Sequence, residues 1–339
     1  MQNTKIEWTD HTFNPWEGCT KVSPGCANCY AENRNARFGG GTAPNWGFGK
    51  PRRRTSVANW NQPLKWDLEA AASGTRPRVF CASLADWLDD EVPIEWLADL
   101  LDLIRKTPNL DWLLLTKRPQ NWRARVEAVM AFAMFSPAHH AMLPWLGMWH
   151  PDHDSGGGVK GSPTPPANVW IGTSVEDFEA ARTRLHHLVS IPASVRFLSC
   201  EPLLGDPLLS AHTVDIPWAG GEARGGRDYS PALTFIHWVI VGGESGPHAR
   251  PMHPDWARSI RDQCKAAEVA FHFKQWGEWL PCVETFDHIG VRVPAETPGP
   301  KEPALHQMSD GQYMARVGKK AAGRLLDGVE HNEFPGGAS

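Results

Sequence analysis

Short apolar segments recur along the chain, and each runs into polar residues and then into an amphipathic stretch. The segments are residues 78–83 (RVFCAS), 111–116 (DWLLLT), 168–173 (NVWIGT), 195–200 (VRFLSC), 237–243 (HWVIVGG) and 270–274 (AFHFK). Runs this short and continuously apolar are typical of strands buried on both faces, as in parallel sheets. We expect a further strand near residues 11–16 (HTFNPW).

Apolar residues at helical spacing occupy residues 94–106, 177–189 and 253–267, between the expected strands. Alternating strands and helices predict βα units around a parallel sheet. About seven units, within a range of six to eight, predict a partial or complete (β/α) TIM-like barrel over residues 1–281. A doubly wound open sheet is the alternative, although no G-x-G-x-x-G follows a strand.

Two Gly- and Pro-rich stretches, near residues 137–167 and 205–235, interrupt this pattern and are expected to be loop insertions. Residues 282–339 show little periodicity and are expected to form a C-terminal appendage.

Composition limits the classes of protein to which the chain can belong. Its 339 residues can bury a large core, and seven scattered cysteines do not form a disulfide framework. No signal peptide or apolar run of about 20 residues is present, so we expect a cytoplasmic protein without a membrane role.

The formal net charge of −4 argues against a protein that coats nucleic acid through bulk electrostatics. A local groove is still compatible with this charge, because residues 50–66 combine basic and tryptophan side chains that suit phosphates and bases. The alternative is an exposed turn followed by a helix anchored by tryptophan. The candidate nucleic-acid contacts are Arg52, Arg53, Arg54 and Trp60.

Polar residues follow six of the expected strands, where a (β/α) barrel builds its functional site. Their recurrence predicts a site for a polar, charged small molecule. The candidates are Ser83, Asp86, Lys117, Arg118, Thr173, Ser174, Glu176, Cys200, Glu201, Gly242, Gly243 and Glu244.

Three cysteines, Cys19, Cys26 and Cys29, are spaced C-x6-C-x2-C directly after the first expected strand. Thiolates gathered in this way suit an iron–sulfur cluster or zinc. Structural zinc needs a fourth ligand, which His11 or a distant cysteine could supply. Three cysteines on a four-iron cluster would instead leave one iron open to a further ligand.

This loop resembles that of the radical S-adenosylmethionine enzymes, barrel proteins whose usual spacing is C-x3-C-x2-C. The resemblance implies a [4Fe-4S] cluster, S-adenosylmethionine bound at the open iron, and an electron donor of the flavodoxin or ferredoxin type. It implies that Cys19, Cys26 and Cys29 are the ligands, and Tyr30 follows the third where superfamily members often place an aromatic residue. The GGES sequence at 242–245 is similar to the superfamily's GGE element, which normally follows the second strand.

A closer resemblance, to the phage-associated three-cysteine-motif family, is carried by six motifs in order: IEWTDHTFNPWEGCTKVSPGCANCYAE, WLLLTKRP, VWIGTSVED, RFLSCEPLLG, WVIVGGESGPHARPMHPDW and FHFKQWGEW. These proteins are described as radical S-adenosylmethionine-like. The implied roles are amine binding by Ser83 and Asp86, carboxylate binding by Lys117 or Arg118, and ribose binding by Glu176 or Glu201. Each of these residues could instead form a salt bridge at the barrel rim.

Cys200 and Glu201 are the candidate catalytic residues. A thiol at a strand end could donate a hydrogen atom to a substrate radical, as a cysteine does in the similar spore photoproduct lyases, or it could be a buried packing residue. The leading hypothesis is a radical S-adenosylmethionine enzyme that acts on a nucleic-acid base or nucleotide, in DNA modification or photolesion repair. The alternatives are a zinc-binding, non-redox protein that binds nucleic acid or protein, and a barrel hydrolase or transferase with Glu201 or Glu244 as base and structural thiols.

Overall fold

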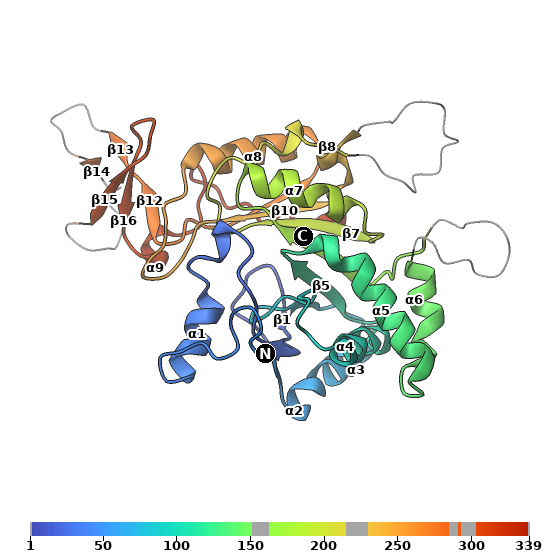
Figure 1. The fold of residues 1–339 in the computed structure, drawn as a ribbon. Helices are drawn as coiled ribbons and strands as arrows, with labels where there is room; N and C mark the ends of the chain where they lie inside the picture. The colour runs from blue at the N-terminus through green and yellow to red at the C-terminus, as the bar shows by residue number, and fades with distance from the viewer. Residues whose placement is uncertain (1, 151–162, 215–229, 285–290, 293–302, 338–339) are drawn as a thin grey trace.

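A curved sheet of seven parallel strands forms the centre of the molecule (Figure 1). The computed structural model describes all residues except 1, 151–162, 215–229, 285–290, 293–302 and 338–339. The strands lie in the order β1 (His11–Thr12), β4 (Arg78–Cys81), β5 (Asp111–Thr116), β6 (Val169–Ser174), β7 (Val195–Cys200), β10 (Trp238–Gly242) and β11 (Ala270–Gln275). All seven segments that were predicted as strands are therefore confirmed.

The order of the strands in the sheet is also their order along the chain. In a doubly wound sheet the order in which strands are added reverses at a switch point. In this sheet each strand lies beside the preceding strand of the series, always on the same side. The sheet consequently curls into a half barrel, which confirms the partial (β/α) barrel and excludes the doubly wound alternative.

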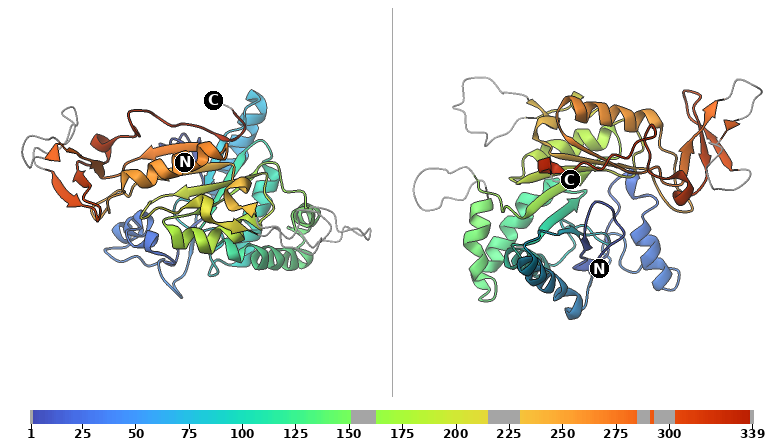
Figure 2. Two further views of the ribbon diagram at one scale, coloured as in Figure 1. Left: turned by 90° about the horizontal axis from the view of Figure 1, so that it is seen from above. Right: turned by 180° about the vertical axis from the view of Figure 1, so that it is seen from behind.

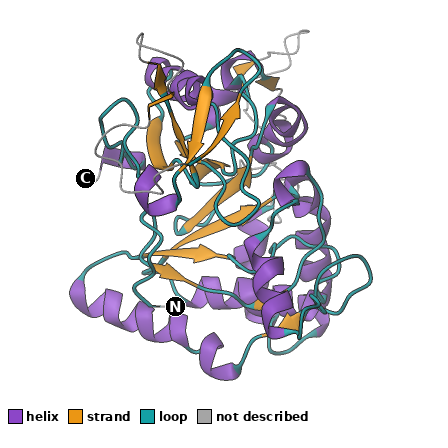
Figure 3. Cartoon of the chain, turned by 90° about the vertical axis from the view of Figure 1, so that its left-hand side faces the viewer, coloured by secondary structure: helices purple, strands orange, loops and turns teal. Residues whose placement is uncertain are grey.

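Helices cover the outer, convex side of the half barrel (Figures 2 and 3). They are α3 (Gln62–Ser73), α4 (Ile94–Lys106), α5 (Trp122–Phe135), α6 (Leu143–Trp149), α7 (Phe178–Val189) and α8 (Pro254–Ala266). Two further helices, α1 (Tyr30–Phe38) and α2 (Val57–Trp60), precede them. The main core lies between these helices and the sheet and contains alternate strand residues such as Val79, Leu114 and Cys200.

A second, aromatic core fills the concave face of the sheet, away from the carboxyl ends of the strands. It consists of Trp8 from the N-terminal segment and strand residues such as Phe80, Phe197 and Trp238, with Phe334 packed against them. Gly172 makes room for this core, because a Cβ there would lie 2.3 Å from the ring of Phe197. Trp8, near the N-terminus, and Phe334, near the C-terminus, thus fill one end of the half barrel. The other end, at which the strands finish, is left for a site.

The two predicted insertions are only partly loops. Residues 140–149, inside the first, form a 3₁₀ turn and α6, while residues 151–162 lie outside the described part. The second contains the short strands β8 (Thr213–Val214) and β9 (Ser230–Pro231), and residues 215–229 between them are likewise not described.

The C-terminal region forms a small antiparallel sheet beside the half barrel. Its strands are β12 (Trp279–Pro281), β16 (Tyr313–Arg316) and β15 (Ala304–Gln307), accompanied by the pair β13 (Val283–Glu284) and β14 (Val291–Arg292) and by helix α9 (Lys319–Ala322). The chain then returns to the half barrel, where the Phe273 amide donates to the carbonyl of His331 at 3.0 Å.

Candidate metal-binding loop at the mouth of the half barrel

Residues 18–29, here called the cysteine loop, lie across the carboxyl ends of the strands. The loop follows β2 (Trp16–Glu17), which pairs with β3 (Arg53–Arg54), and it ends at Cys29, the residue before α1. It begins at Gly18, whose φ of +119° and tight contact with the Asn45 carbonyl require glycine. Figure 1 shows this segment rising from α1 towards β10.

Cys19 lies against a buried ion pair from the second and third strands. The Arg118 guanidinium is 3.0 Å from the Asp86 carboxylate, and it also donates to the Cys19 sulfur at 3.5 Å and to the Thr20 carbonyl at 2.7 Å. Asp86 accepts further bonds from the Thr116 hydroxyl at 2.6 Å and from the Lys117 amide at 2.9 Å. Burial raises the pKa of the Cys19 thiol to about 12, with Asp86 adding to the rise and Arg118 opposing it.

The centre of the loop is fastened to Glu176, at the end of the fourth strand. The carboxylate of Glu176 accepts from the Ser23 hydroxyl at 2.8 Å and pairs with Lys117 at 3.1 Å and Arg184 at 2.6 Å. Burial alone would raise its pKa, but the two cations outweigh burial and lower it to about 2. Gly25 packs directly on this carboxylate, because a Cβ there would lie 2.4 Å from its Cγ atom.

A third fastening joins the last part of the loop to the sixth strand. Asn28 donates to Glu244 at 3.0 Å, and Glu244 pairs with Arg250 at 2.7 Å. Arg250 reaches the loop itself by donating to the Pro24 carbonyl at 3.1 Å. The loop is therefore held by buried charges from β4, β5, β6 and β10, which are far apart in the sequence.

The three cysteines of the loop are half-buried residues, while the other four cysteines are buried. Their sulfurs do not all lie within 4.8 Å of one another. Three thiolates on one tetrahedral zinc ion would be about 3.8 Å apart. The described cysteines therefore form no ready-made metal-ligand cluster.

A separate charged pair lies on the concave side of the sheet. Lys274 of β11 donates to both carboxylate oxygens of Glu201 at 2.7 and 2.8 Å, and Gln275 donates to one of them at 3.3 Å. Gly242 keeps space beside this carboxylate, since a Cβ there would lie 3.3 Å from its Cδ atom. The side chains of Glu201 and Lys274 are 22% and 14% exposed, so solvent reaches both.

Tyr30 begins α1 directly after Cys29. Its hydroxyl donates to the carbonyl of Ser83, which follows the second strand, while 58% of the residue is exposed. Burial of the hydroxyl raises its pKa, and the negative charges of Cys29 and Glu201 add to the rise.

Cys200 does not lie where a catalytic thiol was predicted. Side chains alternate along β7, so Cys200 points to the convex side, where it is fully buried in the main core near Cys264 of α8. This position agrees with the packing alternative and places the thiol away from the mouth of the half barrel. Glu201, one residue later, is on the concave side.

Most other predicted cofactor residues are already engaged within the protein. Asp86, Arg118, Lys117, Glu176 and Glu244 hold the cysteine loop, as described above. The Thr173 hydroxyl donates to the Thr116 carbonyl at 2.8 Å and is fully buried. Gly243 packs on the Trp276 carbonyl, and Ser174 is 2% exposed, whereas Ser83 shares a bond of 3.1 Å with Asn14.

The basic segment is also largely committed to the fold. Arg52 is buried against Asp89 at 2.8 Å, so its predicted contact with nucleic acid is wrong. Arg54 pairs with Asp99 at 2.7 Å and stacks 4.2 Å from the Trp60 ring, which agrees with the structural alternative. Arg53 pairs with Glu17 but remains 59% exposed.

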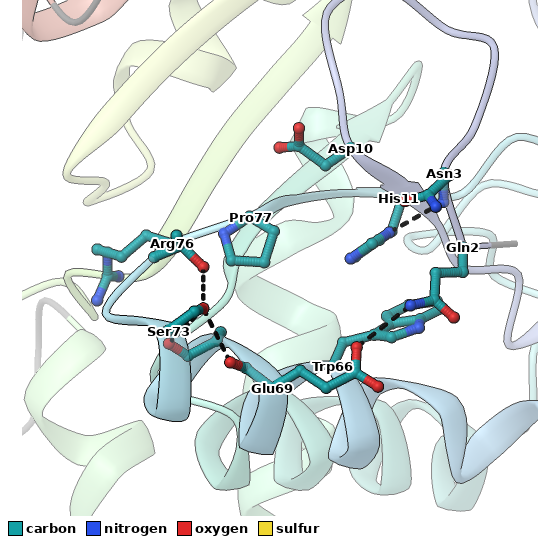
Figure 4. A pocket seen from close by; sticks show the side chains of 11 residues that line it. Gln2, Asn3, Asp10, His11, Trp66, Glu69, Ser73, Arg76 and Pro77 are labelled. Atoms are coloured by element: carbon teal, nitrogen blue, oxygen red, sulfur yellow. Dashed lines mark hydrogen bonds between the residues drawn. The ribbon is translucent and has the colours of Figure 1, made fainter.

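Two other features lie apart from this mouth. A pocket of about 450 Å³ between β1 and α3 is lined by residues such as His11, Trp66 and Glu69 (Figure 4). His253, Asp255 and Asp310 bring possible ligand atoms within 4.8 Å of one another where α8 meets the small sheet, but the two carboxylates are exposed. Neither feature includes a cysteine. His11, which was a candidate fourth ligand for zinc, stacks on Trp66.

Lys274 carried a signal in the sequence, because it is one of the polar residues at strand ends from which the site was predicted, although no specific role was assigned to it. Ser23 and Asn28 carried none, since their partners lie 153 and 216 residues away in the chain.

Comparison with known proteins gave one match. A family model described as "Protein of unknown function (DUF5131)" matches residues 3–335. Neither the curated proteins nor the solved structures gave a match. Among the described residues, no helix is both long and apolar enough to cross a membrane.

Proposed function

The chain belongs to the DUF5131 family over nearly its whole length, and we propose that it is a radical S-adenosylmethionine enzyme acting on a nucleic-acid base or nucleotide. The proposal includes a [4Fe-4S] cluster held by Cys19, Cys26 and Cys29, S-adenosylmethionine as the second cofactor, and DNA modification or repair as the reaction class.

The observation that carries the proposal is the position of the cysteine loop. Three half-buried cysteines lie in a loop at the carboxyl ends of a half barrel, and three sets of charges fix the loop there. Three thiolate ligands would leave one iron of a four-iron cluster for another molecule.

Cys19, Cys26 and Cys29 would hold such a cluster, which would supply the one-electron reduction of S-adenosylmethionine with electrons from a flavodoxin- or ferredoxin-type donor. The chain's own residues position the loop and line the space next to it. Arg118 donates a hydrogen bond to one ligand sulfur, and such bonds tune the reduction potential of a cluster.

The substrate part of the proposal rests on the concave face rather than on the basic segment. Arg52 and Arg54 are used within the fold. Glu201 and Lys274 lie on the concave side, Tyr30 directly follows Cys29, and solvent reaches all three. They offer a carboxylate, an ammonium group and an aromatic ring to a polar, planar substrate.

Anaerobic reconstitution followed by metal analysis tests the proposal directly. We expect a brown protein with about four irons per chain, which forms 5′-deoxyadenosine when dithionite and S-adenosylmethionine are added. Cys26→Ala should lose both properties. Cys282→Ala, which alters a buried cysteine outside the loop, is the matched control and should keep them.

The alternatives predict different results from the same samples. Stoichiometric zinc without iron-dependent absorbance would favour the zinc-binding protein and would contradict the proposal. Full iron loading without S-adenosylmethionine cleavage would contradict the enzymatic part alone.

A further inference from the structure

We propose that Glu201, Lys274 and Tyr30 form a binding pocket for a single nucleobase, here called the base pocket. This inference deepens the proposed function, because it names the group that recognises the substrate beside the cysteine loop.

The charged pair of the base pocket differs from the other ion pairs at the mouth. The pairs of Asp86, Glu176 and Glu244 all bind the cysteine loop. In the described part of the chain, no hydrogen bond joins Glu201 or Lys274 to that loop. The carboxylate of the pair is also more accessible, since 22% of the Glu201 side chain is exposed, against 1% for Glu176 and 7% for both Asp86 and Glu244.

A carboxylate beside an ammonium group matches the edge of a base. Base edges present a hydrogen-bond donor next to an acceptor, and carboxylates accept from the donors while lysine donates to the acceptors. The pair is neutral as a whole, so it favours such a neutral group over a free phosphate or a second carboxylate.

Tyr30 supplies the aromatic surface that a base needs. Its hydroxyl is fixed on the Ser83 carbonyl, which restricts the ring, while more than half of the residue is exposed. Enzymes that act on bases read the edge with hydrogen bonds and stack the ring on aromatic side chains. Because Tyr30 directly follows Cys29, a base stacked there would lie next to the ligand loop.

A charge-reversal experiment distinguishes recognition from simple ion pairing. The double variant Glu201→Lys/Lys274→Glu keeps one charge of each sign but exchanges the donor and acceptor positions. We expect the reconstituted variant to fold, and its Kd for fluorescein-labelled single-stranded oligonucleotides to rise at least tenfold. The matched control is Glu179→Arg/Arg182→Glu, which exchanges an exposed pair on α7 and should leave the Kd unchanged.

A second variant tests stacking independently of the charged pair. Tyr30→Leu keeps an apolar side chain but removes the aromatic face, and we expect the Kd to rise about tenfold. Titration with the separate 5′-monophosphates of adenosine, guanosine, cytidine and uridine shows whether one base edge is preferred.

The outcomes separate this inference from the proposed function. Failure of every oligonucleotide and monophosphate to bind, or an unchanged Kd in the folded charge-reversed variant, would overturn the base pocket even if S-adenosylmethionine is cleaved. The protein could form no cluster and yet bind oligonucleotides less tightly after the exchange of Glu201 and Lys274. That result would support the base pocket and contradict the proposed radical enzyme.

Discussion

Cys19 and Cys200 show how the surroundings of a side chain decide what a thiol can do. Cys19 is partly exposed and accepts a hydrogen bond from Arg118, whereas Cys200 is fully buried in an apolar core. Both follow or end a strand in the sequence, so their local patterns look alike. Side chains alternate between the two faces of the sheet along β7, so Cys200 points away from the site.

We expect Cys200→Ala to retain S-adenosylmethionine cleavage and iron content. It should lower the free energy of unfolding by about 1 kcal/mol, because a small buried group is lost from a packed core. Since burial raises the pKa of the Cys200 thiol well above its usual range, iodoacetamide should not label it in the folded protein. Loss of product formation with normal iron content would restore the catalytic interpretation.

Arg118→Lys tests the contact with the Cys19 sulfur. Lysine keeps the charge opposite Asp86 but cannot reach the carboxylate, the sulfur and the Thr20 carbonyl with one planar group. A hydrogen bond to a ligand sulfur stabilises the reduced cluster, so its loss should lower the midpoint potential by roughly tens of millivolts. A redox titration followed by electron paramagnetic resonance measures this shift, and an unchanged potential at full iron loading would contradict the contact's role.

The strands and helices of the half barrel were largely predictable from the sequence. The apolar segments at 111–116 and 195–200 became β5 and β7 with the same limits, and residues 94–106 became α4. Continuous burial on both faces and strong helical periodicity are local signals. The cysteine loop lacks such signals, because its shape depends on charges supplied by distant strands.

Gly25→Ala tests the packing of the loop on Glu176. The new Cβ would overlap the carboxylate at 2.4 Å, so the loop must move away from its buried partner. We expect iron content after reconstitution to fall below about half, with a loss of roughly 1–2 kcal/mol in stability. Gly41→Ala is the control, since a Cβ there meets nothing within 4 Å and only local strain from its φ of +95° is added. Equal iron loss in both variants would show that the Glu176 contact is unimportant.

At the scale of the whole molecule, the two ends of the chain close the half barrel around His272. This side chain is 1% exposed and lies among Trp238 and Phe334. Burial, together with the nearby cations Arg324 and Lys274, lowers its pKa from 6.5 to about 4. The folded protein therefore binds a proton here less readily than the unfolded chain does.

This depressed pKa predicts a loss of stability in acid. The contribution of neutral His272 is complete above pH 6.5 and declines as the pH falls towards 4, by about 3 kcal/mol in total. His272→Phe should reduce the difference in unfolding free energy between pH 7.5 and 4.5, measured with urea, by about 2 to 3 kcal/mol. The exposed variant His140→Asn should not, and identical pH profiles for wild type and His272→Phe would contradict the assignment.

The sequence by itself determined the βα units, the parallel sheet and the position of three thiols after the first strand, because hydrophobic periodicity and motif spacing are local properties. Tertiary structure alone decided that the barrel is half closed, that Arg52 and Cys200 are buried, and that the cysteine loop is fixed by Asp86, Glu176 and Glu244. It also brought Tyr30 to Ser83, and Lys274 to Glu201 on the concave face. The hydrogen bond between Asn28 and Glu244 joins residues 216 positions apart. These outcomes depend on which faces and charges meet across the sheet.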